Sequence, residues 1–178
     1  MDTPDSHCLS LLDAIAFAAR AHRSQLRKDN QTPYVSHVFR VCLIVRHVFG
    51  VADPRVLTAA VLHDTIEDTT TDYDDLAERF GVDIATWVAA LSKDKRQQDG
   101  PREEAYKAEL ARSPWQVQVC KLADVFDNLL DSGHLAGEKR HKTFQRARAY
   151  LQALQSNLRP EARPHWDTVA QLLARMVI

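Results

Sequence analysis

This 178-residue chain carries, at the end of an apolar segment with helical spacing, the stretch Leu62-His63-Asp64-Thr65-Ile66-Glu67-Asp68-Thr69. Four ionisable side chains fall within its six central residues. His63 and Glu67 are four residues apart, so they share one stripe of a helix. Asp64 and Asp68 share the adjacent stripe, where two carboxylates repel each other unless a positive charge lies nearby. We therefore expect this stretch to end a helix and to face a bound divalent cation.

The rest of the chain predicts an all-α fold. Apolar residues recur at helical spacing along most of it, and its five Gly and seven Pro are few for a β-rich chain. No Asn-Gly or Asp-Gly turn separates alternating strand patterns, and the polar stretch 93–102 is the predicted mobile loop. The predicted helices of this compact multi-helix bundle cover residues 6–25, 36–50, 53–68, 73–80, 82–91, 103–111, 115–130, 138–158 and 161–177.

Length and composition limit the class of protein. We expect one domain over residues 1–178, because a chain of this length can bury one sizeable core. The net charge of −1 argues against a general affinity for nucleic acid or an anionic membrane. The N-terminal residues lack the pattern of a secretory signal, so we expect a cytoplasmic protein. Its three cysteines are predicted to be buried free thiols: Cys8, Cys42 and Cys120.

Two side chains outside the opening stretch are expected to face the same interior. His37 shares a helical stripe with Val41, and Asp124 lies in a segment whose apolar positions require an inward face. With His63 and Asp64 they form a set of two imidazoles and two carboxylates, which suits Mn²⁺, Fe²⁺, Co²⁺ or Zn²⁺ better than Ca²⁺. The open alternative is that these are ordinary polar residues near helix ends, with the histidines merely packed.

The short motifs around these residues resemble those of a known family. The order His37, His63-Asp64, Asp124 is similar to the H…HD…D signature of the HD superfamily. The motifs that flank these residues look like those of the hydrolase domain of RelA/SpoT homologues. Since we expect no room for a synthetase domain after the last helix, the chain resembles the single-domain small alarmone hydrolases, metazoan SpoT homologues among them. These motifs lie within residues 14–130 and follow one another in the same order as in the family. They are Gln25-Leu26-Arg27-Lys28-Asp29, Thr32-Pro33-Tyr34-Val35-Ser36-His37, Leu62 to Thr69, and Lys121-Leu122-Ala123-Asp124 with Asn128.

The resemblance implies a reaction and a cofactor. It implies a single Mn²⁺ that activates water for hydrolysis of the 3′-pyrophosphate of a (p)ppGpp-like alarmone. The metal ligands it implies are His37, His63, Asp64 and Asp124. Glu67 and Asp68 match the catalytic acidic pair of the family. The resemblance therefore implies Glu67 as the general base and Asp68 as its partner, with exchanged roles as the alternative.

Four further residues match positions that contact the nucleotide in this family, namely Arg27, Lys28, Tyr34 and Asn128. A guanidinium such as that of Arg27 can stack on a purine, and the Lys28 ammonium is a point charge for phosphate. Tyr34 has a structural alternative as a half-buried tyrosine in a turn. The basic residues of 138–150 could bind distal phosphates or form a solvated helix face. Family members often have a tyrosine near Phe144, so that phosphate contact is not carried over.

The sequence leaves related activities open. A broader HD nucleotide phosphohydrolase would act on monophosphates, a (p)ppApp hydrolase would act on the adenine alarmone, and a non-catalytic module would bind an alarmone without turnover. A purely structural helical protein gives no reason for two histidines and two aspartates to share one interior. The expected partner is a small-molecule nucleotide, and the patterns predict no particular oligomeric state.

Overall fold

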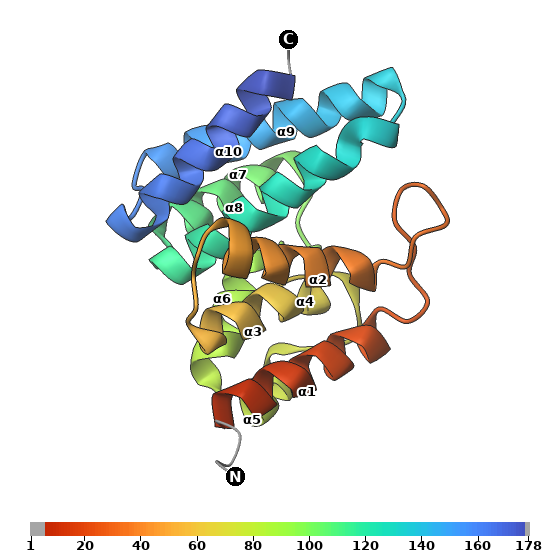
Figure 1. Cartoon of the computed structure of the whole chain (residues 1–178), viewed down its shortest axis with the longest axis vertical. Coiled ribbons are helices and arrows are strands. Elements are labelled where there is room, and N and C mark those ends of the chain that lie inside the picture. Colours follow the sequence, from red (N-terminus) through yellow and green to blue (C-terminus); the bar gives the residue numbers. More distant parts are fainter. Residues whose placement is uncertain (1–5, 177–178) are drawn as a thin grey trace.

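A computed structural model describes residues 6–176 of the chain (Figure 1). These residues form helices and helical turns and contain no β-strand; one isolated β-bridge joins Leu26 to Pro33. The predicted all-α bundle is therefore confirmed. The α-helices are α1 (Ser6–Ala21), α2 (Val35–Leu43), α3 (Pro54–Leu62), α4 (Thr65–Asp68), α5 (Tyr73–Phe80), α6 (Val82–Leu91), α7 (Asp99–Arg112), α8 (Trp115–Leu130), α9 (Gly137–Gln155) and α10 (Arg163–Met176). The shorter turns are η1 (Ile44–Val48), η2 (Asp131–His134) and η3 (Pro160–Ala162).

The helices near the two chain ends lie at opposite ends of the bundle. In Figure 1, α9 and α10 lie at the top, α1 and α5 lie at the bottom, and α2 and α3 lie between them. Helix α2 packs against both α3 and α8, and α8 also packs against α9 and α10. Three segments that are distant in the sequence, carrying His37, His63 and Asp124, are therefore neighbours in space.

Helix α3 is buried along most of its length. Its residues 56–62 are all buried, as expected of a helix that is hydrophobic almost all round. Asp53 caps the start of α3, because its side chain accepts a hydrogen bond of 2.9 Å from the Arg55 N–H, and Pro54 occupies the first turn. The enclosed helix delivers His63, which is only 2% exposed, to the interior of the protein.

The prediction of one continuous helix over residues 53–68 is wrong. Helix α3 ends at Leu62, a turn contains His63 and Asp64, and the separate short helix α4 follows. The acidic pair Glu67 and Asp68 therefore lies on a different element from α3. The expectation that His63 and Glu67 share one helical stripe, and Asp64 and Asp68 the next, therefore does not hold for this segment.

Two side chains account for the break between α3 and α4. His63 Nδ1 lies 2.9 Å from the Ala60 carbonyl oxygen, and Thr65 Oγ1 donates a hydrogen bond of 2.7 Å to the Leu62 carbonyl oxygen. A continuing α-helix would pair these two carbonyls with backbone N–H groups one turn further on. Side chains that occupy such carbonyls compete with the helix, and here they replace its last turn.

The second predicted helix, residues 36–50, consists of α2 followed by the π-helical turn η1. In η1 the Phe49 N–H donates a hydrogen bond of 2.9 Å to the Ile44 carbonyl oxygen, five residues earlier. Gly50 ends the helical segment, as predicted, with a φ of 73°. Glycine adopts this left-handed conformation without the steric cost that a side chain brings.

The predicted loop 93–102 is shorter than expected. Helix α7 begins at Asp99, so Gly100 and Pro101, which suggested a loop, lie in its first turn. A proline is tolerated there because the N–H groups of a first turn have no helical partner.

The cysteine prediction is confirmed for the side chains that the structure describes. Cys42 and Cys120 are free and buried, whereas the Cys8 side chain lies outside the described part. None of the helices within residues 6–176 combines the length and the apolar character that crossing a membrane requires.

Candidate active site

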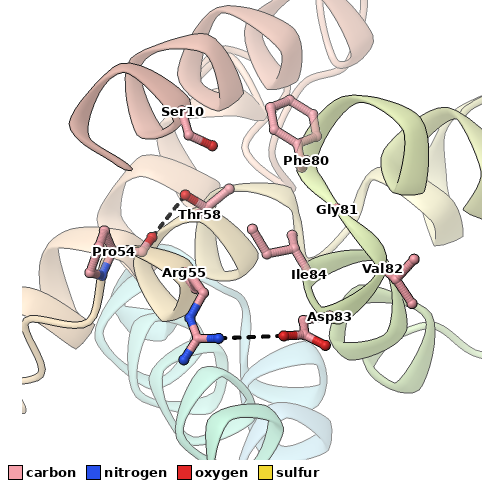
Figure 2. A pocket seen from close by; sticks show the side chains of 9 residues that line it. All are labelled: Ser10, Pro54, Arg55, Thr58, Phe80, Gly81, Val82, Asp83 and Ile84. Atoms are coloured by element: carbon pink, nitrogen blue, oxygen red, sulfur yellow. Dashed lines mark hydrogen bonds and ion pairs between the residues drawn. The ribbon is translucent and has the colours of Figure 1, made fainter. Parts of the chain in front are cut away.

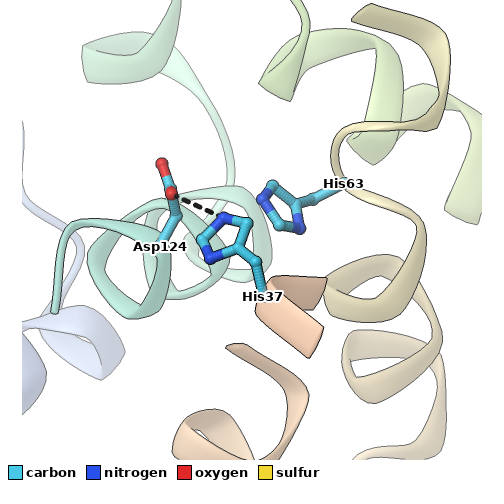
Figure 3. Close-up of side chains that lie close together, drawn as sticks. All are labelled: His37, His63 and Asp124. Atoms are coloured by element: carbon cyan, nitrogen blue, oxygen red, sulfur yellow. Dashed lines mark ion pairs between the residues drawn. The ribbon is translucent and has the colours of Figure 1, made fainter. Parts of the chain in front are cut away.

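Three segments place potential metal ligands around one point. His37 comes from α2, His63 from the end of α3 and Asp124 from α8, and Figure 3 shows the three side chains pointing toward one another. One ligand atom of each lies within 4.8 Å of the others. His37 Nε2 is 3.3 Å from Asp124 Oδ1. Both imidazoles are 2% exposed, so the group lies in the interior rather than on the surface.

Asp64 joins this group from the turn after α3. Its Oδ2 atom lies 3.0 Å from His63 Nε2 and 3.6 Å from His37 Nε2. The four side chains predicted as ligands are therefore brought together. The set of two imidazole nitrogens and two carboxylates is a mixed nitrogen and oxygen donor set of the kind that Mn²⁺ or Zn²⁺ accepts.

The outer nitrogen of each imidazole already has a partner. His63 Nδ1 faces the Ala60 carbonyl oxygen at 2.9 Å, and His37 Nδ1 faces Asp127 Oδ2 at 2.7 Å. The Ala60 carbonyl oxygen can only accept a hydrogen bond, and so can the ionised carboxyl of Asp127. Each Nδ1 therefore carries a proton. The Nε2 atoms are the ones that face the cluster.

The surroundings of His63 Nε2 give the most direct support for a metal site. Although it lies 3.0 Å from Asp64 Oδ2, it is not aligned for a hydrogen bond with that oxygen. It is a buried polar atom without a hydrogen-bond partner among the described residues. Buried polar groups are rarely left in this state unless an ion or water completes them. The donor set therefore fits a divalent metal.

The charges of the cluster depend on one another. Burial alone would lower the pKa of His37, but the carboxylates of Asp124 and Asp127 outweigh it and raise that pKa to about 9. Burial would raise the pKa of Asp64, yet His63 and His37 hold it below its usual range. The pKa of Asp124 is likewise held low against burial, chiefly by the Lys121 ammonium. The two carboxylates are thus ionised and suited to bind a cation.

The acidic pair on α4 lies beside these ligands. Glu67 accepts a hydrogen bond of 2.9 Å from the Lys93 N–H on one oxygen, Oε2. Burial raises the pKa of Glu67, although Lys93 opposes the shift. Asp68 forms an ion pair of 2.9 Å with Lys95. A half-buried carboxyl with a raised pKa accepts a proton more readily than an exposed one.

A cavity of about 500 Å³ contains all ten residues that the sequence singled out. Its wall holds four carboxylates beside the histidines, namely Asp64, Glu67, Asp68 and Asp124. It also holds seven cationic side chains, namely Arg27, Lys28, Lys93, Lys121, Lys139, Lys142 and Arg146. Four of these cations are paired with carboxylates, whereas Lys28, Lys139 and Arg146 have no ion pair among the described residues. This cavity therefore favours an anionic ligand larger than a metal ion.

The predicted nucleotide contacts lie at different points of the cavity wall. Arg27 donates two hydrogen bonds, of 2.7 and 3.2 Å, to the same oxygen of Asp131, and its guanidinium lies 5.8 Å from the centre of the Tyr34 ring. Tyr34 donates a hydrogen bond of 2.6 Å to Asp64. Asn128 donates to the carboxylate of Asp124, and Lys28 is exposed. Tyr34 and Asn128 therefore contact predicted metal ligands.

Several residues near the site were missed by the sequence interpretation. Lys121 pairs with Asp124 at 2.9 Å and lies 4.2 Å from the centre of the Tyr150 ring. Lys93 pairs with Glu103 at 2.9 Å, and its ammonium lies 5.9 Å from the centre of the same Tyr150 ring. Lys121 is the first residue of the motif Lys121-Leu122-Ala123-Asp124, but the sequence interpretation assigned it no role; its position three residues before the ligand, on the same face of α8, was a usable signal. Lys93 and Tyr150 gave no such signal, because only the fold brings them to the cavity.

A second cavity, of about 350 Å³, lies beside α3 and the start of α6 (Figure 2). Its polar groups pair with one another. Arg55 lies 3.4 Å from Asp83, and the Thr58 hydroxyl donates a hydrogen bond of 2.8 Å to the Pro54 carbonyl oxygen. Because it is lined by a single carboxylate and no histidine, this cavity lacks the donor set of the first.

Comparisons with known proteins agree with this site. The HD domain family matches residues 14–151. The chain is 39% identical over 130 residues to the human guanosine-3′,5′-bis(diphosphate) 3′-pyrophosphohydrolase MESH1, with 71% of each chain covered. It is 38% identical over 121 residues to the Drosophila melanogaster protein of the same name, with 67% of this chain and 68% of that one covered.

A solved structure agrees as well. The structure of a metazoan orthologue of SpoT that hydrolyses ppGpp superposes with a TM-score of 0.80 and 29% sequence identity, covering 96% of this chain and 97% of that one. The match extends over nearly the whole helical bundle and therefore includes all three segments that carry the clustered histidines and aspartates. The chain belongs to the HD-domain family and is related in sequence to the MESH1 pyrophosphohydrolases over most of its length.

Proposed function

We propose that this protein is a metal-dependent pyrophosphohydrolase that removes the 3′-pyrophosphate from (p)ppGpp-like guanosine alarmones. One observation carries the proposal: two imidazoles and two carboxylates surround one point in a cavity whose remaining wall is rich in cations. A polyphosphorylated nucleotide needs both halves of that cavity, one to activate water and the other to neutralise phosphate charge. The names of the relatives supply the substrate class.

The proposed metal is Mn²⁺, and its proposed ligands are His37, His63, Asp64 and Asp124. When bound, such a cation polarises a phosphate oxygen and lowers the pKa of water. The residues hold their donor atoms in place without it, because both Nδ1 atoms and the Asp64 and Asp124 carboxylates are fixed by other hydrogen bonds. Little reorganisation is then required on binding.

Glu67 is proposed as the general base. One of its oxygens is held by the Lys93 N–H, while Oε1 has no hydrogen-bond donor among the described residues. That free oxygen can take a proton from the attacking water as the water oxygen bonds to the phosphorus nearest the ribose. The bond from this phosphorus to the 3′ oxygen breaks, pyrophosphate leaves with the oxygen of the water, and the 3′ oxygen takes a proton from solvent to become the ribose hydroxyl. Asp68, held by Lys95, is proposed to orient the water.

The cationic half of the cavity is proposed to bind the rest of the nucleotide. Lys28, Lys139 and Arg146 have no carboxylate within ion-pair distance among residues 6–176, so their charges are available to phosphate. Arg27 presents a guanidinium held at its edge by Asp131. A purine stacked on the face of that guanidinium would leave the ion pair intact.

The activity is tested by product identification. Metal-free protein is incubated with ppGpp and, separately, ppApp, and Mn²⁺ is then restored. We expect pyrophosphate and GDP from ppGpp only after Mn²⁺ is added. Release of orthophosphate instead would show a broader nucleotide phosphohydrolase. Faster turnover of ppApp would show the adenine alarmone as substrate, and binding of ppGpp without turnover would show a non-catalytic module.

We also place this activity in the cytoplasm. Cys42 and Cys120 are free thiols, which persist in a reducing compartment, and the proposed substrate is a free nucleotide. Fractionation of cells that express the full chain, followed by immunoblotting, tests this location. Recovery of the protein outside the cytoplasmic fraction would contradict it.

A further inference from the structure

Asp127 lies directly behind His37, on the opposite side of the imidazole from the proposed metal position. It follows Asp124 by three residues on α8 and is 1% exposed. Its Oδ2 atom is 2.7 Å from His37 Nδ1, and its Oδ1 atom accepts a hydrogen bond of 2.6 Å from Arg40 Nε. One buried carboxylate thus serves two donors that come from α2.

Each oxygen of Asp127 has one hydrogen-bonding donor from α2, and Arg27 lies in a longer ion pair, 3.8 Å from Oδ2. A carboxylate offers only acceptors, and Arg40 occupies Oδ1, so Oδ2 receives the proton of His37 Nδ1. The Nε2 atom of His37 is then the nitrogen left for a metal, and it points at Asp124 from 3.3 Å. A rotated ring would lose the bond to Asp127 and leave a buried carboxylate oxygen unpaired.

We propose that Asp127 is a positioning residue of the metal centre, which fixes the ring of His37 and keeps its proton on Nδ1 so that Nε2 is the ligand atom. The inference rests on the proposed metal site. Carboxylates that accept from the outer nitrogen of a ligating histidine orient the ring and raise its basicity as a ligand. His63 is held by a backbone carbonyl instead, so Asp127 is the partner that a substitution can change.

Asp127→Asn isolates this role because it keeps the shape of the side chain. An asparagine offers one acceptor oxygen to the two donors His37 and Arg40, so one of them faces an amide group that only donates. We expect the dissociation constant for Mn²⁺, measured by calorimetry on folded metal-free protein, to rise by about 10- to 100-fold. Asp13→Asn removes an exposed ion pair with Arg79 far from the cavity and serves as the matched control, with no change in Mn²⁺ affinity.

A second substitution separates positioning from general stability. In the Asp127→Asn background, Arg40→Met removes the competing donor and frees the asparagine oxygen for His37 Nδ1. We expect Mn²⁺ binding to recover, although one more polar contact has been lost. A double variant that binds Mn²⁺ no better than Asp127→Asn would overturn the proposal, as would an Asp127→Asn variant with wild-type affinity.

The unmodified protein provides a test that does not depend on the variants folding. In Zn²⁺-loaded protein, ¹H–¹⁵N correlations through the imidazole ring identify which nitrogen of His37 carries a proton. We expect the proton on Nδ1 and the metal on Nε2, whereas a proton on Nε2 would overturn the proposal. If the wild-type protein binds neither Zn²⁺ nor Mn²⁺, the metal centre of the proposed function fails instead. If the wild type binds metal but His37 carries its proton on Nε2, only the proposed role of Asp127 fails and the metal centre stands.

Discussion

The hydroxyl of Tyr34 donates a hydrogen bond of 2.6 Å to Oδ2 of Asp64, the same oxygen that lies 3.0 Å from His63 Nε2. Asp64 stands in the turn between α3 and α4. Tyr34, from the start of α2, therefore links the turn to another element of the site. Burial and then the nearby Asp64 carboxylate raise the pKa of this tyrosine, so it stays a donor.

Tyr34→Phe should weaken metal binding without unfolding the protein. The substitution removes one hydrogen bond to a charged group, worth about 1.5 kcal/mol, which corresponds to roughly a 10-fold higher dissociation constant for Mn²⁺. Calorimetric titration of the metal-free protein measures this change. Tyr73→Phe is the matched control, because the Tyr73 hydroxyl only contacts Thr86 at 3.3 Å on the surface. Equal Mn²⁺ affinities for the two variants would show that Tyr34 does not hold Asp64.

Asp64→Ala should remove both bound metal and turnover. The variant loses a carboxylate that faces both imidazoles, and His63 Nε2 loses the acidic oxygen that lies 3.0 Å away. Elemental analysis after desalting measures the metal, and pyrophosphate release measures turnover. Asp83→Ala, at the second cavity, should retain both. Unchanged hydrolysis by Asp64→Ala would remove the metal centre from the proposal.

Glu67→Gln should separate catalysis from metal binding. The glutamine retains an oxygen for the Lys93 N–H but cannot accept a proton, so turnover should fall by roughly two to four orders of magnitude. Metal content should stay near that of the wild type, because Glu67 is not among the clustered donor atoms. Glu104→Gln on α7 is the control, since within residues 6–176 Glu104 pairs with Lys107 alone, at the surface. A variant that turns over at the wild-type rate would exclude Glu67 as the base.

Lys121→Met should destabilise the metal-free protein more than the metal-loaded one. Lys121 is the buried partner of Asp124, and removing one member of a buried pair costs about 3 kcal/mol. Urea unfolding with and without Mn²⁺ measures the loss, and the cation should restore part of it by compensating Asp124. Lys107→Met removes an exposed pair and should cost no more than about 0.5 kcal/mol. A loss that Mn²⁺ does not reduce would mean that Lys121 acts only through packing.

The helices could be predicted from spacing because apolar periodicity reports burial directly. The segment around Val38 and Val41 illustrates this, since both residues are fully buried on the face that the spacing predicts. His37 could be chosen as a metal-ligand candidate for the same reason, because it shares a buried stripe with Val41, where an unpaired polar group is costly.

The break between α3 and α4 could not be predicted in this way. It depends on His63 and Thr65 taking carbonyls of the preceding turn, and such local competition leaves no mark on the apolar pattern. Asp127 was overlooked although it stands three residues after Asp124 on the same helix. Its partners on α2 are about ninety residues away in sequence, and only the packing of α2 against α8 unites them.

The ion pair between Arg27 and Asp131 has a consequence for recognition. An arginine side chain normally loses considerable rotamer freedom when it is immobilised against a ligand. Here the guanidinium is already clamped along one edge by Asp131, with its side chain only 8% exposed and the Tyr34 ring close by. A flat heterocycle that stacks on it meets a side chain that is already held in place. Binding then costs little side-chain entropy, so the fit between the base and the guanidinium can decide which base is preferred.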